Sequence, residues 1–412
     1  MEPITVIYLA YSFIAFYFLF LFILTYIQNK KDIFSYPKSN KNYSLSLVVP
    51  CYNEGNTIEE TIKSILNAGY KNLKKVIVVD DCSKDNSYEI IKKLAKKYPK
   101  VMAVQTPKNT GCAAGSKNYG AKFVDTELIG FSDGDSFIEK GSIDKMVGFF
   151  NDIKVASVTA SVLVHNRNNF IEKLQAIEYK IIKFSRKLLE FFDSIYVTPG
   201  PLGIFRKSAF DKVGGFDEKN LTEDIEITWH FVKKGWGIEM SFPAIVYTVV
   251  PAKISDWFKQ RVRWNVGGIQ TIVKYNRTFL KCGMLGKFIL PFFVFGWVIG
   301  ILGLFFLAYS IFRQIFLRVL TATYSVSAEV AIITMDEIKL VPNIMWFFGI
   351  TVFVFGLFYT LIGLIYASDR DKVQYKRPKV LDIFIYAIFY LLMYPPLMIY
   401  SIYKYATGYR SW

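Results

Sequence analysis

Four long apolar stretches limit what this 412-residue chain can fold into more than any other feature of its sequence. Each is almost free of charged residues and long enough to cross a lipid bilayer, which takes about 20 residues in a helix. The first follows Met-Glu-Pro rather than a basic start and has lysines behind it, so we expect a membrane anchor and not a cleaved signal peptide. The four predicted spans are Ile4 to Ile27, Phe288 to Phe312, Val341 to Ala367 and Val380 to Tyr403.

Two details of the C-terminal region need separate predictions. Pro395 and Pro396 lie inside the last span, and we expect them to kink its helix, which packed membrane helices tolerate. The stretch Ile315 to Lys339 is moderately apolar, but it contains Arg318 and three acidic residues. We interpret it as an external or interfacial segment, with a re-entrant or crossing helix as the alternative.

The basic residues of the short loops predict which side of the membrane the rest of the chain faces. Four lysines lie between residues 28 and 43, and five Lys or Arg residues lie between residues 369 and 379. If both groups are cytosolic, the chain crosses four times and the long segment Ser44 to Lys287 faces the cytosol. Arg313, Arg318 and Lys404 would then lie outside, so the rule is not satisfied everywhere.

The net charge of +16 is compatible with two kinds of partner, namely nucleic acid or anionic lipid together with an anionic substrate. No basic run in a soluble segment is interleaved with exposed aromatic residues, so we expect membrane lipids and no nucleic acid. The chain has four cysteines, none in a Cys-x-x-Cys pair, and two histidines. This argues against a zinc site and fits a reducing compartment.

Between the first two spans, short apolar strands alternate with helical segments. The predicted strands are Leu45 to Val49, Val76 to Val79, Val101 to Gln105 and Leu128 to Ser132. Helices are predicted at 58–66, where Thr57 offers an N-cap with Glu60 three residues later, and at 87–97. The alternation predicts an α/β fold with a doubly wound, mostly parallel sheet, which binds ligands at the carboxyl ends of its strands.

Two of these strands are followed by pairs of carboxylates. Asp133 and Asp135 are two residues apart, so they can point the same way and share one cation. Such hard oxygen ligands suit Mg²⁺ or Mn²⁺ carrying a diphosphate. Turns are rich in Asp and Gly, so each motif alone is a weak signal, and Asp80 with Asp81 can equally cap a helix. Their common position at strand ends favours a binding site.

Two further motifs lie closer to the second span. Asp224, in Thr222-Glu223-Asp224, precedes a helical stretch, where a carboxylate can complement the helix dipole or accept a proton from an acceptor hydroxyl. The residues alone leave both roles open. The run from Gln260 to Trp264 lies in a stretch, 255–275, that alternates basic and aromatic residues. Its simplest interpretation is an interfacial amphipathic helix, and a role in binding is compatible with it.

In this order, five motifs resemble the membrane branch of the family-2 inverting glycosyltransferases. That branch includes hyaluronan, chitin, cellulose and poly-N-acetylglucosamine synthases and ceramide glucosyltransferase. The motifs are Pro50-Cys51-Tyr52-Asn53-Glu54, Asp80-Asp81, Asp133-Gly134-Asp135, Thr222-Glu223-Asp224 and Gln260-x-x-Arg263-Trp264. The resemblance covers about Ser44 to Gln270. It implies a cytosolic GT-A-type domain at 44–250, after an anchor and linker at 1–43, followed by interfacial helices at 251–287 and a C-terminal membrane region at 288–412.

The resemblance also implies roles for individual positions. Asp224 would be the catalytic base, and Asp133 with Asp135 would hold the metal, Mg²⁺ or Mn²⁺. The UDP-sugar donor would contact Tyr52, Glu54, Asp80, Asp81, Lys117 and Asp133. The diphosphate and the acceptor would contact Gly200, Arg206, Glu223, Gln260, Arg263 and Trp264.

The expected activity is sugar transfer to a growing polysaccharide at the cell membrane, a reaction that can be coupled to export. The alternative is transfer of a single sugar to a lipid acceptor, either a glycolipid or a polyprenyl-phosphate, which the narrow pore of four spans favours. Where many relatives have Thr-Glu-x-Pro, this chain has Thr248-Val249-Val250-Pro251, so the sugar is not assigned. A non-catalytic binding protein is the third reading, and loss of Asp135 or Asp224 would have indicated it; both are present.

Overall fold

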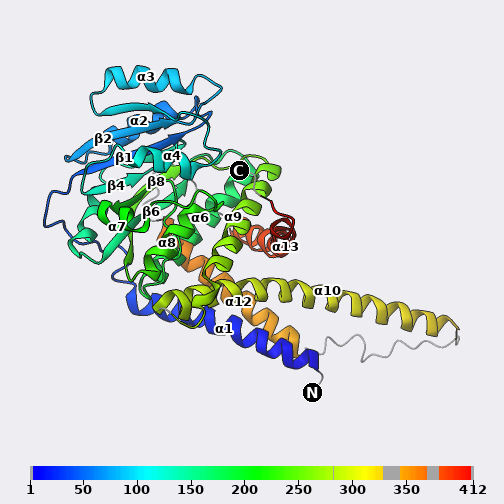
Figure 1. Cartoon of the computed structure of the whole chain (residues 1–412). Helices are drawn as coiled ribbons and strands as arrows, with labels where there is room; N and C mark the ends of the chain where they lie inside the picture. Colours follow the sequence, from blue (N-terminus) through cyan, green and yellow to red (C-terminus); the bar gives the residue numbers. More distant parts are fainter. Residues whose placement is uncertain (1–2, 282, 328–343, 369–379, 410–412) are drawn as a thin grey trace.

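The computed structural model describes residues 3–281, 283–327, 344–368 and 380–409, and shows a sheet-containing domain beside a group of long helices (Figure 1). The strands form one eight-stranded sheet in the order β3-β2-β1-β4-β7-β6-β8-β5. They are β1 (Leu45–Cys51), β2 (Leu73–Asp80), β3 (Val101–Gln105), β4 (Leu128–Phe131), β5 (Ser136–Ile138), β6 (Val155–Val164), β7 (Gly203–Arg206) and β8 (Gly237–Thr248). Only β7 and β5 run antiparallel to their neighbours, so the predicted mostly parallel sheet is confirmed.

Helices cover both faces of the sheet because successive strand residues point to opposite sides. Leu47 and Val49 of β1 belong to the core on one face, whereas Val48 belongs to the core on the other. The first face is covered by α2 (Ile58–Asn67), α3 (Ser87–Lys97) and α5 (Asp144–Val147). The second is covered by α4 (Ala113–Ala121), α6 (Phe170–Glu190), α7 (Lys207–Val213) and α8 (Glu223–Lys233).

The start of α2 differs from the sequence prediction. Thr57 lies at the N-cap position but makes no capping bond. Its hydroxyl instead lies 2.9 Å from Glu54 Oε2 and 3.1 Å from the carbonyl oxygen of Gly134. The Thr57 hydroxyl therefore interacts with these partly buried oxygens and accepts no hydrogen bond from the first N–H groups of the helix. A capping box does form at α6, between Asn169 and Glu172, where none was predicted.

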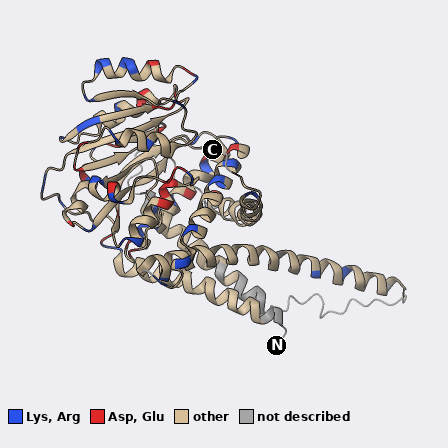
Figure 2. Ribbon diagram, viewed as in Figure 1, with Lys and Arg blue, Asp and Glu red and all other residues tan. Residues whose placement is uncertain are grey.

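The membrane region consists of α1 (Pro3–Asn29), α10 (Leu290–Ser327), α12 (Ile344–Ser368) and α13 (Val380–Ala406). Within the described ranges, three segments are long and apolar enough to cross a membrane by length and composition: Val6–Asn29, Leu285–Tyr324 and Leu381–Ala406. The shorter apolar helix Phe353–Tyr366 lies in α12, where the third span was predicted. Figure 2 shows few charged residues along these helices, as expected of a membrane protein.

Two C-terminal predictions need comment. The stretch from Ile315 to Ser327 is not a separate segment, because it continues α10, and residues 328–339 lie outside the described residues. No proline or glycine interrupts the chain there, so the helix extends to about 57 Å, roughly twice the hydrocarbon thickness of a bilayer. Pro395 and Pro396 lie inside α13, which is assigned as one helix through both of them.

The sheet domain is joined to the membrane helices mainly through α6 and α9 (Ile254–Tyr275). The C-terminal half of α6 packs on α12, where Ser185 Oγ lies 2.6 Å from the hydroxyl of Tyr359. α13 packs along α9, with Leu397 in the same buried cluster as Trp257. One of the two connecting helices, α9, therefore also carries the motif from Gln260 to Trp264.

Candidate active site

The carboxyl ends of neighbouring strands bring the acidic motifs to one edge of the sheet. Cys51 at the end of β1 is paired with Asp80 at the end of β2, and the backbone N–H of Asp81 donates to the Cys51 carbonyl at 2.8 Å. β4 is the next strand on the other side of β1, so Asp133 follows at the same edge. The Thr57 hydroxyl, which lies near both Glu54 and the Gly134 carbonyl, joins the motif after β1 to the turn after β4. The structure thus brings the first three motifs together, as the strand pattern predicted.

Asp80 and Asp81 are both buried and are held by protein donors. Asp80 Oδ2 accepts from Gln105 Nε2 at 2.9 Å, and its Oδ1 has no partner among the described residues. Asp81 accepts from the hydroxyl of Thr106 at 2.7 Å, and from the hydroxyl and the N–H of Thr110 at 2.7 and 3.0 Å. The pair therefore shapes the loop that follows β3. Direct contact with a nucleoside stays a prediction, although Tyr52 beside the pair is 44% exposed.

Asp133, Asp135 and Glu54 form an acidic group at this edge. Burial, followed by the charges of Asp133 and Glu54, raises the pKa of Asp135 to about 7. Burial also raises the pKa of Glu54, with Asp133 contributing. Lys117 is a cation in contact with this group, and its Nζ lies 3.3 Å from Asp133 Oδ1. The group thus has excess negative charge, which a divalent cation would offset.

The carboxylates present suit a metal ion that is bound partly by the protein and partly by a ligand. They do not suit an ion that is bound by protein side chains alone. The described part of the chain holds no group of three or more His, Cys, Asp or Glu residues arranged for a metal. Asp133 and Asp135 can supply two oxygen ligands, and the remaining ones would come from a diphosphate or water, as is usual for Mg²⁺. Gly200 leaves no room beside them, since a Cβ there would lie 2.3 Å from Asp133 Oδ2.

Arg206 lies at the wrong end of the sheet for the role predicted from the resemblance. β7 is antiparallel to β4, so Gly203 pairs with Phe131 at the site edge and Arg206 pairs with Leu128 at the opposite edge. The four residues of β7 thus run from the site edge of the sheet to the opposite edge. The Arg206 guanidinium donates to the backbone carbonyls of Phe150, Asp152 and Val155. The predicted contact of Arg206 with the diphosphate or acceptor is therefore wrong. Arg206 instead holds the loop before β6.

The first turn of α8 places two carboxylates next to the acidic group. Glu223 Oε1 lies 2.9 Å from Lys117 Nζ, so Lys117 joins the donor-side Asp133 to α8. Burial and the charge of Glu223 raise the pKa of Asp224 to about 7, and Lys117 acts against them. The sequence missed a second buried cation near Asp224, which is Arg186 of α6. Its Nε has no hydrogen-bond partner among the described residues, and burial lowers its pKa.

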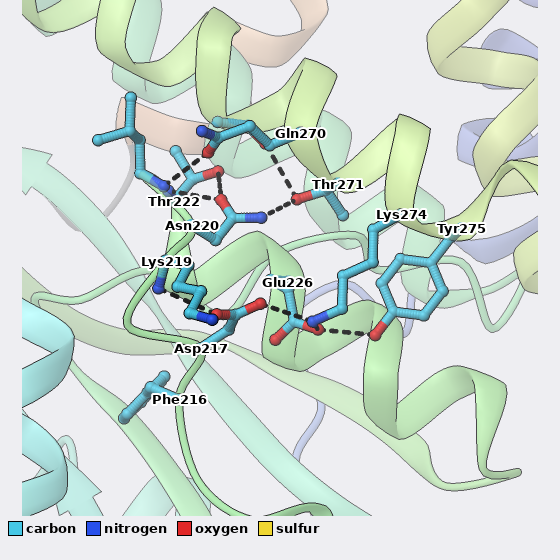
Figure 3. Close-up of polar contacts among 12 residues, drawn as sticks. Phe216, Asp217, Lys219, Asn220, Thr222, Glu226, Gln270, Thr271, Lys274 and Tyr275 are labelled. Atoms are coloured by element: carbon cyan, nitrogen blue, oxygen red, sulfur yellow. Dashed lines mark hydrogen bonds and ion pairs between the residues drawn. The ribbon is translucent and has the colours of Figure 1, made fainter. Parts of the chain in front are cut away.

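The loop before α8 is fastened to the C-terminal half of α9 (Figure 3). Asn220 Nδ2 donates to the hydroxyl of Thr271 at 2.9 Å, and the N–H of Leu221 donates to Gln270 Oε1 at 2.9 Å. These bonds come from residues directly before Thr222-Glu223-Asp224. The position of the candidate base therefore depends on α9.

A charged group completes this attachment one turn further along α9 (Figure 3). Lys274 Nζ lies 2.6 Å from carboxylate oxygens of both Asp217 and Glu226, and the Tyr275 hydroxyl donates to Glu226 at 2.7 Å. Glu226 is in the same helix as Asp224. Residues before and after Asp224, the candidate base, are thus bonded to α9.

The N-terminal half of α9 contains Gln260, Arg263 and Trp264, all partly buried. Sequence reasoning missed Arg261, which is 1% exposed and forms an ion pair with Glu178 of α6. Its spacing from Trp257 and Trp264 places it on the buried face of the helix, and this spacing is the signal that could have identified it. The motif residues thus surround a buried ion pair.

Comparison with known proteins supports a common ancestry for the sheet domain. Residues 46–214 match Glycosyl transferase family 2. The chain is 28% identical over 278 residues to a poly-beta-1,6-N-acetyl-D-glucosamine synthase of Staphylococcus aureus (strain MSSA476), and 30% identical over 250 residues to one of Staphylococcus epidermidis. The alignments cover 67% and 60% of this chain. They cover 66% and 60% of those relatives, slightly less than two thirds of their length.

A solved structure extends the likeness of fold to nearly the whole chain. It is the mannosyltransferase PcManGT from Pyrobaculum calidifontis, determined in complex with GDP-Man and Mn²⁺. The two align over 97% of each chain with a TM-score of 0.56 and 16% sequence identity. The likeness shows a shared fold, a GT-A-type sheet domain with long apolar helices.

The contact between α9 and the loop before α8 can be tested with two adjacent glycines. A Cβ at Gly267 would lie 2.3 Å from the Thr222 hydroxyl and 2.7 Å from its backbone nitrogen, whereas a Cβ at Gly268 would meet nothing within 4 Å. We expect Gly267→Ala to cost about 1–3 kcal/mol by overpacking. Gly268→Ala should be neutral or slightly stabilising, because alanine favours a helix by about 0.5–1 kcal/mol. Melting temperatures in one detergent would show this, and equal values for the two variants would contradict it.

Proposed function

We propose that the chain is a family-2 glycosyltransferase, to whose family description residues 46–214 match, and that it transfers a sugar from a UDP-sugar to a growing polysaccharide, with inversion at the anomeric carbon. The observation that carries the proposal is the partly buried carboxylate of Asp224, with a pKa of about 7, which follows Glu223 and so lies next to the ion pairs that join Glu223 through Lys117 to the acidic group at the sheet edge. The relatives' names favour a polysaccharide over a single lipid acceptor and make N-acetylglucosamine the first sugar to test.

The donor would bind at the edge formed by β1, β2 and β4. Asp133 and Asp135 would hold Mg²⁺ or Mn²⁺, and the bound ion would offset the charge of the diphosphate. The PcManGT complex, which has a similar fold, contains Mn²⁺ beside its GDP-Man. Tyr52 and Glu54, with Asp80 and Asp81 behind them, would contact the uridine. Asp81 would act partly through the loop that it holds by Thr106 and Thr110.

The transfer step needs a base and a stabilised leaving group. As the acceptor hydroxyl attacks the anomeric carbon, Asp224 would accept its proton while the bond from that carbon to UDP breaks. Arg263 and Gln260, both on α9, would contact the diphosphate as negative charge develops on it, and Trp264 would contact the acceptor. A base with a pKa near 7 is about half ionised at neutral pH and still basic enough to take the proton.

Lys117 would keep this base active. Burial acts to lower the pKa of Lys117, but the charges of Asp133, Glu223 and Asp224 raise it well above its usual value. Lys117 therefore stays charged at neutral pH. Its charge opposes the increase in the pKa of Asp224 that burial and Glu223 cause. This role was not predicted from the sequence, which suggested a contact with phosphate.

We expect Asp224→Asn to stop transfer and to leave UDP binding intact. Asparagine has nearly the same shape but cannot accept the proton, and loss of a general base typically costs about 10²- to 10⁴-fold in rate. A transfer assay beside calorimetric titration with UDP would measure both properties. Asp81→Ala is the contrasting variant, because it should lose UDP affinity. If Asp224→Asn keeps most of its turnover, Asp224 is only a helix-start residue.

The pKa of Asp224 predicts how the rate depends on pH. Because the active base is deprotonated, kcat/KM should be nearly constant above pH 8 and decrease as the pH falls through 7, to about a tenth at pH 6. Asp135, with a similar pKa, is the competing cause. A metal ion competes with protons for Asp135, so raising its concentration tenfold would shift the decrease if Asp135 were responsible. We expect no such shift; a shift, or a decrease centred near pH 4, would contradict the assignment.

We further propose that the sheet domain faces the cytosol, where nucleotide-sugars are made, and that the chain is a multi-pass protein of the cell membrane. A single cysteine at the exposed Lys97 of α3, in a variant without other cysteines, should resist an impermeant thiol reagent in intact cells. The same cysteine should react after the cells are permeabilised, which serves as the control. Labelling in intact cells would show the opposite orientation.

A further inference from the structure

Arg261 is buried inside the motif from Gln260 to Trp264, although the proposed mechanism assigns it no role. Its side chain is 1% exposed and that of its partner Glu178 is 4% exposed, with Arg261 Nη2 bonded to Glu178 Oε2. A buried ion pair is costly to desolvate, and it is stable only when its remaining atoms also find hydrogen bonds. The other bonds to this pair therefore indicate what holds it in place.

The membrane helix α13 supplies two of those bonds. The Tyr390 hydroxyl donates to Glu178 Oε2 at 2.7 Å, and the Tyr394 hydroxyl donates to Glu178 Oε1 at 2.9 Å. The two tyrosines are four residues apart, so they lie on one face of the helix, with their rings stacked 5.3 Å apart. Both oxygens of Glu178 are thus satisfied by donors from α9 and α13.

The other side of Arg261 contacts the residues of the motif. Its Nη1 donates to Gln260 Oε1 at 2.7 Å, and its guanidinium carbon lies 4.1 Å from the centre of the Trp264 ring. The second distance is within the range of a cation–π interaction, which a planar guanidinium makes especially well. One turn earlier, Trp257 packs against Tyr390 with ring centres 6.0 Å apart. The orientation of Gln260 and Trp264 therefore depends on Arg261.

We propose that Glu178 and Arg261 are positioning residues for sugar transfer, and that Tyr390 and Tyr394 of the last membrane helix fix them in place. The proposal rests on the function proposed above, because it concerns Gln260 and Trp264 as contacts of the diphosphate and the acceptor. The membrane helix thereby forms part of the catalytic apparatus. The residues that would bind the metal and the uridine lie elsewhere, at the ends of β1, β2 and β4, and Gln260 would act on the diphosphate only as negative charge develops on it during transfer.

The double variant Tyr390→Phe/Tyr394→Phe removes only the two hydroxyls. The matched control is Tyr386→Phe. The Tyr386 ring centre lies 4.5 Å from that of Tyr390, but within the described residues the donors to Glu178 are Arg261, Tyr390 and Tyr394. We expect kcat of the double variant to fall about 10- to 100-fold, as misplacement of catalytic contacts by about 1 Å does. The KM for the donor and the Kd for UDP should stay within about twofold, and the control should match the unmodified chain.

Arg261→Lys separates positioning from simple charge balance. Lysine can neutralise Glu178 but cannot bond Gln260 and stack on Trp264 at the same time. We therefore expect its kcat to fall as in the double variant. If Arg261→Lys has the kcat of the unmodified chain, Arg261 only balances a charge and the proposal is overturned.

Hydrogen–deuterium exchange of peptides from residues 254–266 gives a readout that does not need activity. Exchange should be faster in the double variant than in Tyr386→Phe, with peptides from β1 and β2 unchanged. If kcat and exchange equal those of the control, or if UDP affinity falls in parallel with kcat, the proposal is wrong. If the unmodified chain transfers no sugar, the proposed function fails, and the exchange result still decides whether α13 holds α9.

Discussion

The buried ammonium group of Lys117 is the interaction on which the candidate active site depends. It lies 3.3 Å from Asp133 at the end of β4 and 2.9 Å from Glu223 at the start of α8, and its side chain is 3% exposed. Removing one member of a buried ionic group typically costs about 3–5 kcal/mol, because the remaining charge has no partner. Lys117 therefore fixes the distance between the donor side and the base, and its charge moderates the pKa of Asp224.

Helix α9 then connects this site to the membrane. Its C-terminal half is bonded to Asn220 in the loop before α8 and to Glu226 within α8. Its N-terminal half carries Arg261, which pairs with Glu178, and α13 donates a hydrogen bond to the same glutamate. One helix therefore contacts both the segment that carries the candidate base and the partly buried motif residues. A GT-A-type domain alone would lack this second support, which explains why the long helices accompany the domain here.

The sequence predicted the elements whose signal is local. Strands with buried runs ended at the acidic pairs as expected, and the helix at 87–97 was placed correctly, because periodicity and terminal residues determine them. It could not predict Arg206 correctly, since the antiparallel pairing of β7 with β4 depends on tertiary structure. The ion pairs of Lys117 and Arg261 were missed for the same reason. Their partners, Glu223 and Glu178, are 106 and 83 residues away in the chain.

The central claim is that this chain extends a polysaccharide from a UDP-sugar. The most direct test is to incubate the purified protein, in lipid nanodiscs with Mn²⁺ or Mg²⁺, with a panel of radiolabelled nucleotide-sugars and to size the product. The account predicts a polymer from one UDP-sugar, with UDP-N-acetylglucosamine tested first, and no product with excess chelator. A product limited to one sugar on a lipid, or full activity without a divalent metal, would contradict it.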